Sequence, residues 1–353
     1  MPQDGSRGRL RTGKSPPLRG TPAVPNAHGA AYAQSGARGL RCSLLPETAL
    51  RTWSRHAPRR FEKQLSFIPI RRYCCDCEGA SVARVTDTAI HKMIGVAGRR
   101  LHVARWHSGA SERPPLLLLN GIGMNLELLA PVARSLPERE VICFDMPGTG
   151  NSPDPVFPYS ISCMALTTAS LLDRLEIDRA DVLGISWGGA VAQQFAFQHR
   201  ARIGKLVLAA TAAGATMIPG NAALLAHLSD PREYSVERTL KRNLASIYNG
   251  GGSARVSLNA AKAPSPLGFS YQMAAFASWS SLPILPMLSM PVMVMADEED
   301  QLVPPSNAHF LHHAIAHSEL EMFRGGGHLF MLSQRERFVA RLRTFLDDDA
   351  HAC

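Results

Sequence analysis

The stretch that decides the fold is D-V-L-G-I-S-W-G-G-A-V-A-Q-Q-F-A, residues 181–196. It starts as a continuous apolar run, typical of a strand with both faces covered, and continues as an alanine-rich apolar helix. Between the two lies the pattern Gly-x-Ser-x-Gly at residues 184–188. A serine on a tight strand-to-helix turn presents its hydroxyl at the edge of a sheet, and flanking glycines avoid clashes with neighbouring backbone. The segment therefore predicts a nucleophile at Ser186.

Apolar runs of the same kind recur on both sides of this segment. They lie at residues 101–106, 116–120, 141–145, 181–186, 205–210, 292–296 and 320–323. Helix-length segments between them occupy residues 160–175, 188–203, 305–316 and 333–347. Because strands and helices alternate and several strands are apolar throughout, the sequence predicts an α/β fold with a mostly parallel sheet flanked by helices.

Residues 213–285 interrupt this alternation. They have helical patches, a turn-rich Y-N-G-G-G-S and a group of aromatic side chains, but no convincing buried strand. An insertion of roughly 70 residues is too long for an ordinary loop between two strands. We therefore expect a mostly helical cap at 213–285 over the active edge of the sheet, and an α/β core at 81–212 and 286–348.

Residues 1–80 differ from the rest of the chain in charge and composition. They hold 14 of the 38 basic and 5 of the 29 acidic residues, and so account for the whole formal charge of +9. They are rich in Gly, Pro, Ser, Ala and Arg without sustained periodicity, and we expect a basic, disordered leader. The rest of the chain is balanced in charge, so a nucleic-acid partner loses its compositional support.

The sequence also bears on location and cofactors. The first residues lack the apolar stretch of a secretory signal, whereas an organelle transit peptide or a start codon placed too far upstream stays open. Seven cysteines, an odd number, favour reduced thiols in a cytoplasm. Cys74 to Cys77 lack a second pair at finger spacing, and no apolar run approaches the 18 residues of a membrane-spanning helix. We expect a cytoplasmic protein without metal, cofactor or transmembrane segment.

A catalytic serine needs a base, and the base needs an orienting acid. In a fold with this strand–serine–helix turn, the acid and then the base follow the serine along the chain. The turn A-D-E-E-D-Q-L-V-P follows one late strand, and G-G-G-H-L-F follows the last strand. This order predicts Asp300 as acid and His328 as base for Ser186, with Asp297 as the second choice for the acid.

The oxyanion formed during attack needs two preorganised N–H donors. One is expected to be the amide of Trp187, which follows the nucleophile. The other is expected in the loop N-G-I-G-M-N after the strand at 116–120, with Ile122 as first choice and Gly123 as second. Side chains expected to contact the substrate are those of Met124, Phe269 and Phe276.

Seven motifs carry a resemblance to a known family. They are N-G-I-G-M-N-L-E-L, F-D-M-P-G-T-G, G-I-S-W-G-G-A-V-A-Q-Q-F-A, K-L-V-L-A-A-T-A-A-G-A, Y-N-G-G-G, D-Q-L-V-P and G-G-H-L-F. On them, residues 82–347 resemble the α/β-hydrolase family and, within it, the intracellular poly(3-hydroxyalkanoate) depolymerases of bacteria. The resemblance implies an α/β-hydrolase fold, a triad of Ser186, Asp300 and His328, and a polyester of 3-hydroxy fatty acids as substrate. Asp297 departs from the glycine usual in the family.

Three classes of function follow from these residues. The leading hypothesis is a serine hydrolase that cleaves a hydrophobic polyester or acyl ester through an acyl-enzyme, with the polymer granule surface as a candidate location. A small-ester, lactone or carbon–carbon bond hydrolase with the same triad is the alternative among enzymes. Epoxide hydrolases and haloalkane dehalogenases are disfavoured because they need Asp in place of Ser186. A non-catalytic binding protein on a hydrolase fold is the alternative from another class.

Overall fold

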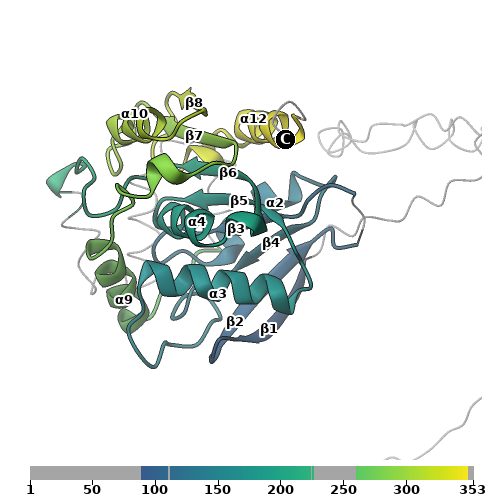
Figure 1. Ribbon diagram of the computed structural model, residues 1–353. Helices are drawn as coiled ribbons and strands as arrows, with labels where there is room; N and C mark the ends of the chain where they lie inside the picture. The colour runs from purple at the N-terminus through teal and green to yellow at the C-terminus, as the bar shows by residue number, and fades with distance from the viewer. Residues whose placement is uncertain (1–88, 110–111, 224, 226–259, 349–353) are drawn as a thin grey trace, which may run out of the picture. The chain divides into compact units, whose positions relative to one another are not determined.

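The computed structural model describes residues 89–109, 112–223, 225 and 260–348 (Figure 1). The leader predicted at residues 1–80 lies outside the described residues, as do residues 224 and 226–259 of the segment predicted as a cap. The boundaries of those two regions therefore stay predictions.

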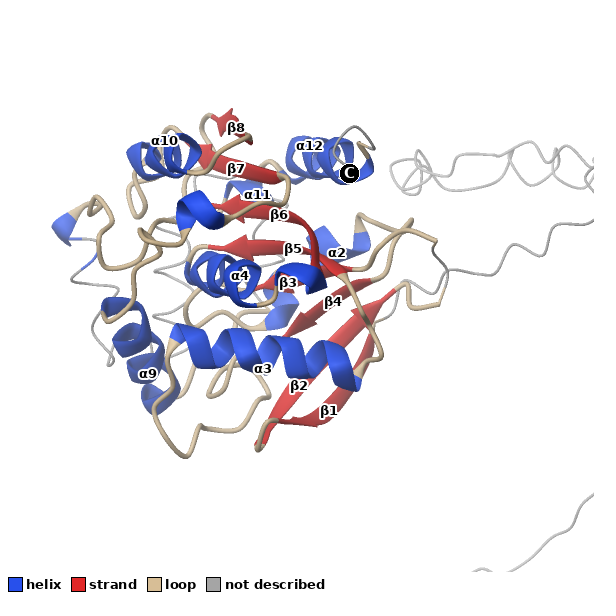
Figure 2. Ribbon diagram, viewed as in Figure 1, coloured by secondary structure: helices blue, strands red, loops and turns tan. Residues whose placement is uncertain are grey.

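Eight strands form one sheet in the order β1-β2-β4-β3-β5-β6-β7-β8 (Figure 2). The strands are β1 Ile90–Val96, β2 Arg99–Trp106, β3 Leu116–Leu119, β4 Val141–Phe144, β5 Ala180–Ile185, β6 Ile203–Ala209, β7 Val292–Asp297 and β8 Ser318–Phe323. Strand β2 pairs antiparallel with β1 and β4, and all the other pairings are parallel. The predicted α/β fold with a mostly parallel sheet is confirmed.

Helices cover both faces of the sheet (Figure 2). The helices are α2 Ala130–Arg134, α3 Ile161–Arg174, α4 Trp187–Gln198, α9 Pro266–Ala277, α10 Pro305–Ala314, α11 Phe330–Ser333 and α12 Arg335–Asp347. Alternate residues of the central strands point to opposite faces. Leu116 and Leu118 of β3 pack in the cluster that contains α2, α11 and α12, whereas Leu117 and Leu119 pack with α3, α4 and α10.

The prediction lacks the short helices α2 and α11, and two longer elements differ from it. Strand β1 is missing from it, because β1 is an edge strand with mostly exposed residues and pairs only with β2. The helix expected at 188–203 ends at Gln198 and is followed by a 3-10 turn at Arg200–Arg202 and by β6. Both differences come from tertiary pairing that no local pattern encodes.

Helix α9 is the long helix described within residues 213–285. Ser265 begins it by accepting a hydrogen bond from the amide of Gly268 at 2.9 Å, and Pro266 occupies its first turn, as at many helix N-termini. Gly268 packs against Gly148 in the loop after β4 so closely that a Cβ on Gly268 would lie 2.6 Å from the Gly148 Cα. This close approach seats α9 against the core.

Candidate active site

Ser186 lies on the turn between β5 and α4 in a strained backbone conformation, with φ 52° and ψ −118°. Two glycines make this turn possible. A Cβ on Gly184 would lie 2.6 Å from the Ala192 Cβ, and one on Gly188 would lie 2.1 Å from the Leu119 carbonyl oxygen. The turn therefore has the strand–serine–helix geometry that the Gly-x-Ser-x-Gly pattern predicts.

His328 and Asp300 meet Ser186 at the carboxyl end of the sheet. The Nε2 atom of His328 is 3.1 Å from the Ser186 Oγ, and its Nδ1 atom is 2.8 Å from the Asp300 Oδ2. The other carboxylate oxygen of Asp300 accepts from the amides of Leu302 and Val303, at 2.9 Å each. Because both His328 and Asp300 are buried, the surrounding chain fixes the imidazole in this orientation.

Asp297, the second choice for the acid, makes no hydrogen bond with His328. Its carboxylate is fully buried and accepts from the amide of Gly326 at 2.8 Å and from that of Glu299 at 2.9 Å. Asp297 thus ties the turn that carries Asp300 to the loop that carries His328. Its contacts are those of a residue that holds backbone, which favours Asp300 as the acid.

The loop after β3 lies beside the serine, as a Cβ on Gly121 would be 3.6 Å from the Ser186 Cβ. Within the described part of the chain, the amides of Ile122 and Trp187 donate to no protein acceptor. The amide of Gly123, the second choice, donates to Gln272 Oε1 at 2.7 Å and is therefore engaged. Of the two candidates in this loop, Ile122 has the amide that is free to meet an oxyanion.

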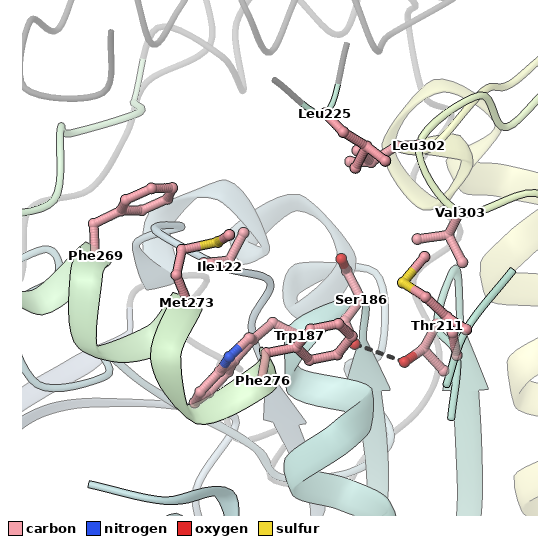
Figure 3. A pocket seen from close by; sticks show the side chains of 12 residues that line it. Ile122, Ser186, Trp187, Thr211, Leu225, Phe269, Met273, Phe276, Leu302 and Val303 are labelled. Atoms are coloured by element: carbon pink, nitrogen blue, oxygen red, sulfur yellow. Dashed lines mark hydrogen bonds between the residues drawn. The ribbon is translucent and has the colours of Figure 1, made fainter. Parts of the chain in front are cut away.

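A cavity of about 130 Å³ opens beside Ser186 (Figure 3). Among the described residues its lining carries no charged side chain and consists of Ile122, Ser186, Trp187, Thr211, Ala212, Met217, Leu225, Phe269, Met273, Phe276, Leu302 and Val303. Phe269, Met273 and Phe276 reach it from α9, and Figure 3 shows these three side chains on one side of the helix. Two of the three predicted substrate contacts, Phe269 and Phe276, thus line the cavity.

Met124, the third predicted contact, is buried in the core and does not line the cavity. Several lining residues were missed by the sequence reasoning. Leu302 and Val303 lie two and three residues after Asp300 in D-Q-L-V-P, and the position of that motif could have identified them. Met217 gave no comparable signal, because only the folded chain brings it to the serine.

The structure offers little other chemistry near the serine. Burial, followed by the nearby charge of Asp145, raises the pKa of the Cys143 thiol well above its usual range, so this thiol stays protonated and unreactive. Among the described residues, no three His, Cys, Asp or Glu side chains gather as a metal site, and no helix is long and apolar enough to cross a membrane.

A scan against family models matches residues 114–334 to the family described as alpha/beta hydrolase fold. The chain belongs to the α/β-hydrolase family. This α/β hydrolase is 39% identical over 247 residues to a poly(3-hydroxyalkanoate) depolymerase from Ectopseudomonas oleovorans, covering 68% of the chain and 87% of the relative. It is 29% identical over 238 residues to 3-oxoadipate enol-lactonase 2 from Acinetobacter baylyi, covering 65% and 87%.

Solved structures agree with this family assignment at the level of the fold. An esterase from Exiguobacterium antarcticum superimposes with a TM-score of 0.65 at 22% identity, over 73% of this chain and 100% of the esterase. An enol-lactonase from Burkholderia xenovorans LB400 gives the same TM-score, identity and coverage. Neighbours with such different activities share the architecture, so the chemistry has to be argued from the site.

Proposed function

We propose that this α/β hydrolase cleaves the ester bonds of a poly(3-hydroxyalkanoate) through an acyl-enzyme and releases 3-hydroxy fatty acids. One observation carries the proposal: the Ser186 Oγ lies 3.1 Å from an imidazole whose other nitrogen meets Asp300, beside an apolar cavity. The 39% identity to a depolymerase supports the choice of polyester. A cytoplasmic location at polymer granules belongs to the same proposal.

The proposed reaction gives each of these groups a role. Ser186 attacks the ester carbonyl while His328 Nε2 takes the hydroxyl proton, and Asp300 holds the Nδ1–H tautomer and stabilises the imidazolium. The amides of Ile122 and Trp187 donate to the oxyanion of the tetrahedral intermediate. His328 then returns the proton to the leaving alcohol, and a water molecule activated by the same imidazole releases the acid.

The lining of the cavity bears on the class of acyl group. Apart from Ser186 and Thr211, its side chains are apolar, and the Thr211 hydroxyl is bound to the Ser186 carbonyl at 2.7 Å. Such a surface favours an apolar acyl chain through the hydrophobic effect. A lactone derived from oxoadipate bears a carboxylate, and none of the described lining residues is basic. The lactonase alternative is therefore disfavoured.

Hydrolysis of polymer suspensions tests the proposal. We expect purified protein to clear suspensions of poly(3-hydroxyalkanoate) and to release 3-hydroxy acids, whereas Ser186→Ala does neither. Polymers with short and with medium side chains, a chromogenic acyl ester and an enol-lactone are compared at equal enzyme concentration. Turnover of the small ester or lactone with no acid released from any polymer would reject the polyester and leave a small-ester or lactone hydrolase.

A further inference from the structure

Gln272 in α9 links the cap helix to both segments that carry the proposed oxyanion donors. Its side-chain Oε1 accepts from the Gly123 amide at 2.7 Å, and its backbone carbonyl accepts from the Trp187 indole Nε1 at 2.9 Å. Gln272 is fully buried, and hydrogen bonds away from water are stronger and more exacting in geometry than those at a surface.

The two partners of Gln272 are adjacent to, or part of, the oxyanion site. Gly123 follows Ile122, and its φ of 65° lies in the left-handed region that favours glycine. The hydrogen bond from the Gly123 amide to Gln272 helps to hold the loop in this bend. Trp187 supplies one proposed donor through its amide, while its indole is held under α9 (Figure 3). A shift of Gln272 therefore displaces both donors at once.

The side-chain NH2 group of Gln272 argues against a purely structural role. Its Nε2 atom is buried and makes no hydrogen bond of good geometry among the described residues, although the side chain also interacts with the Tyr159 hydroxyl. A buried donor that is incompletely paired costs stability, so a leucine or methionine would suit a residue that only fills space. The acceptor on this side chain is the feature that an apolar residue cannot replace.

We propose that Gln272 is a positioning residue that couples the seating of α9 to the assembly of the oxyanion hole. With Gln272 in place, the amides of Ile122 and Trp187 stand where the tetrahedral intermediate needs them. Phe269, Met273 and Phe276 of the same helix line the cavity. The helix that contacts the acyl chain therefore also positions the oxyanion hole. The inference rests on the proposed ester hydrolysis but does not require a polymer as substrate.

Gln272→Met, which keeps the side-chain length and removes the acceptor, tests the proposal. We expect kcat for a chromogenic ester to fall roughly 10- to 100-fold with little change in KM, less than the loss on deleting a direct oxyanion donor. Affinity for a boronic acid, whose adduct with Ser186 places an oxygen in the hole, should fall by a similar factor. Gln272→Glu, which keeps an acceptor oxygen, should recover part of both.

Two further variants complete the design. Ser270→Ala changes an exposed residue of the same helix and should leave kcat, KM and boronate affinity unchanged. Trp187→Phe removes the indole donor to the Gln272 carbonyl and keeps the Trp187 amide. It should cost less than Gln272→Met, and the double mutant should lose less than the product of the two factors. Trp187→Phe also tests the coupling if Gln272→Met fails to fold.

Separate outcomes reject the inference and the proposed function. If Gln272→Met lowers the melting temperature but leaves kcat and boronate affinity at the wild-type level, Gln272 is structural and the inference is wrong. The same holds if kcat falls while boronate affinity does not. If the wild-type protein turns over no ester and Ser186 does not react with a fluorophosphonate, the proposed function itself fails.

Discussion

Two buried histidine–aspartate pairs among the described residues have almost the same contact distance. His328 Nδ1 lies 2.8 Å from Asp300 Oδ2, and His102 Nδ1 lies 2.7 Å from Asp145 Oδ2. In each pair the second carboxylate oxygen accepts from backbone, as Asp145 Oδ1 does from the Leu126 amide at 2.7 Å. Neither distance nor burial distinguishes the two pairs.

The two pairs differ in what the other imidazole nitrogen, Nε2, contacts. His328 Nε2 faces the Ser186 hydroxyl beside a cavity, whereas His102 Nε2 lies 3.1 Å from Nδ1 of the exposed, stacked His91 on β1. The Asp145 pair instead joins β2 to the loops that follow β3 and β4. A buried pair of this kind is thus a candidate for catalysis only where its second nitrogen meets a nucleophile.

The largest expected effect is that of Ser186→Ala. The change removes the attacking oxygen and keeps the turn between β5 and α4, so turnover of a chromogenic ester should fall by roughly 10⁴ to 10⁶. The melting temperature should stay near the wild-type value. Near-normal turnover by the folded variant would refute Ser186 as the nucleophile. It would also remove the feature that distinguishes the His328–Asp300 pair from the His102–Asp145 pair.

Asp300→Asn is expected to have the next largest effect. An amide in place of the carboxylate holds the imidazole in the wrong tautomer, so kcat at neutral pH should fall by roughly 10² to 10⁴. Steady-state kinetics of the folded variant measures this. Full activity would mean that the contact between Asp300 and His328 contributes no more to catalysis than the one between Asp145 and His102.

Asp297→Asn distinguishes a carboxylate that holds backbone from one that holds an imidazole in the same turn. From the sequence alone this change should cost little, but Asp297 accepts from the amides of Gly326 and Glu299. An asparagine keeps only one of the two acceptor oxygens and has an NH2 donor in place of the other. We therefore expect kcat to fall about tenfold and the melting temperature to be lower. A loss larger than that of Asp300→Asn would reverse the assignment of the acid.

Asp145→Asn makes the same substitution in the other pair and should have the smallest effect on turnover. We expect kcat within about threefold of wild type, because the Asp145 carboxylate bonds to His102, Leu126 and Asn151 and not to the serine. Stability should instead fall by about 1–3 kcal/mol, since a buried acceptor is replaced by a donor. Thermal unfolding measures this loss. Inactivation of the folded variant would show that the two pairs are not independent.

Much of the fold and of the candidate triad could be predicted from local patterns. Ser186 and Asp300 follow the buried apolar strands β5 and β7, and His328 follows the half-buried edge strand β8. Parallel strands end at one edge of a sheet, so chain order alone brings these residues together. Gln272 and Met273 could not be found in this way. Their proposed roles depend on the contact between α9 and Trp187. A contact between segments about 85 residues apart produces no periodic pattern in the sequence.

The contact between Gly148 and Gly268 bears on the design of chimaeras. Each backbone fills the space that a Cβ on the other would need, so an alanine at either position pushes α9 away from the core. A segment from another hydrolase that replaces α9 therefore has to bring its own glycine at the first turn of this helix, and the recipient has to keep Gly148. In a combinatorial library aimed at new substrates, these two codons are best held fixed while the apolar side chains around them are varied.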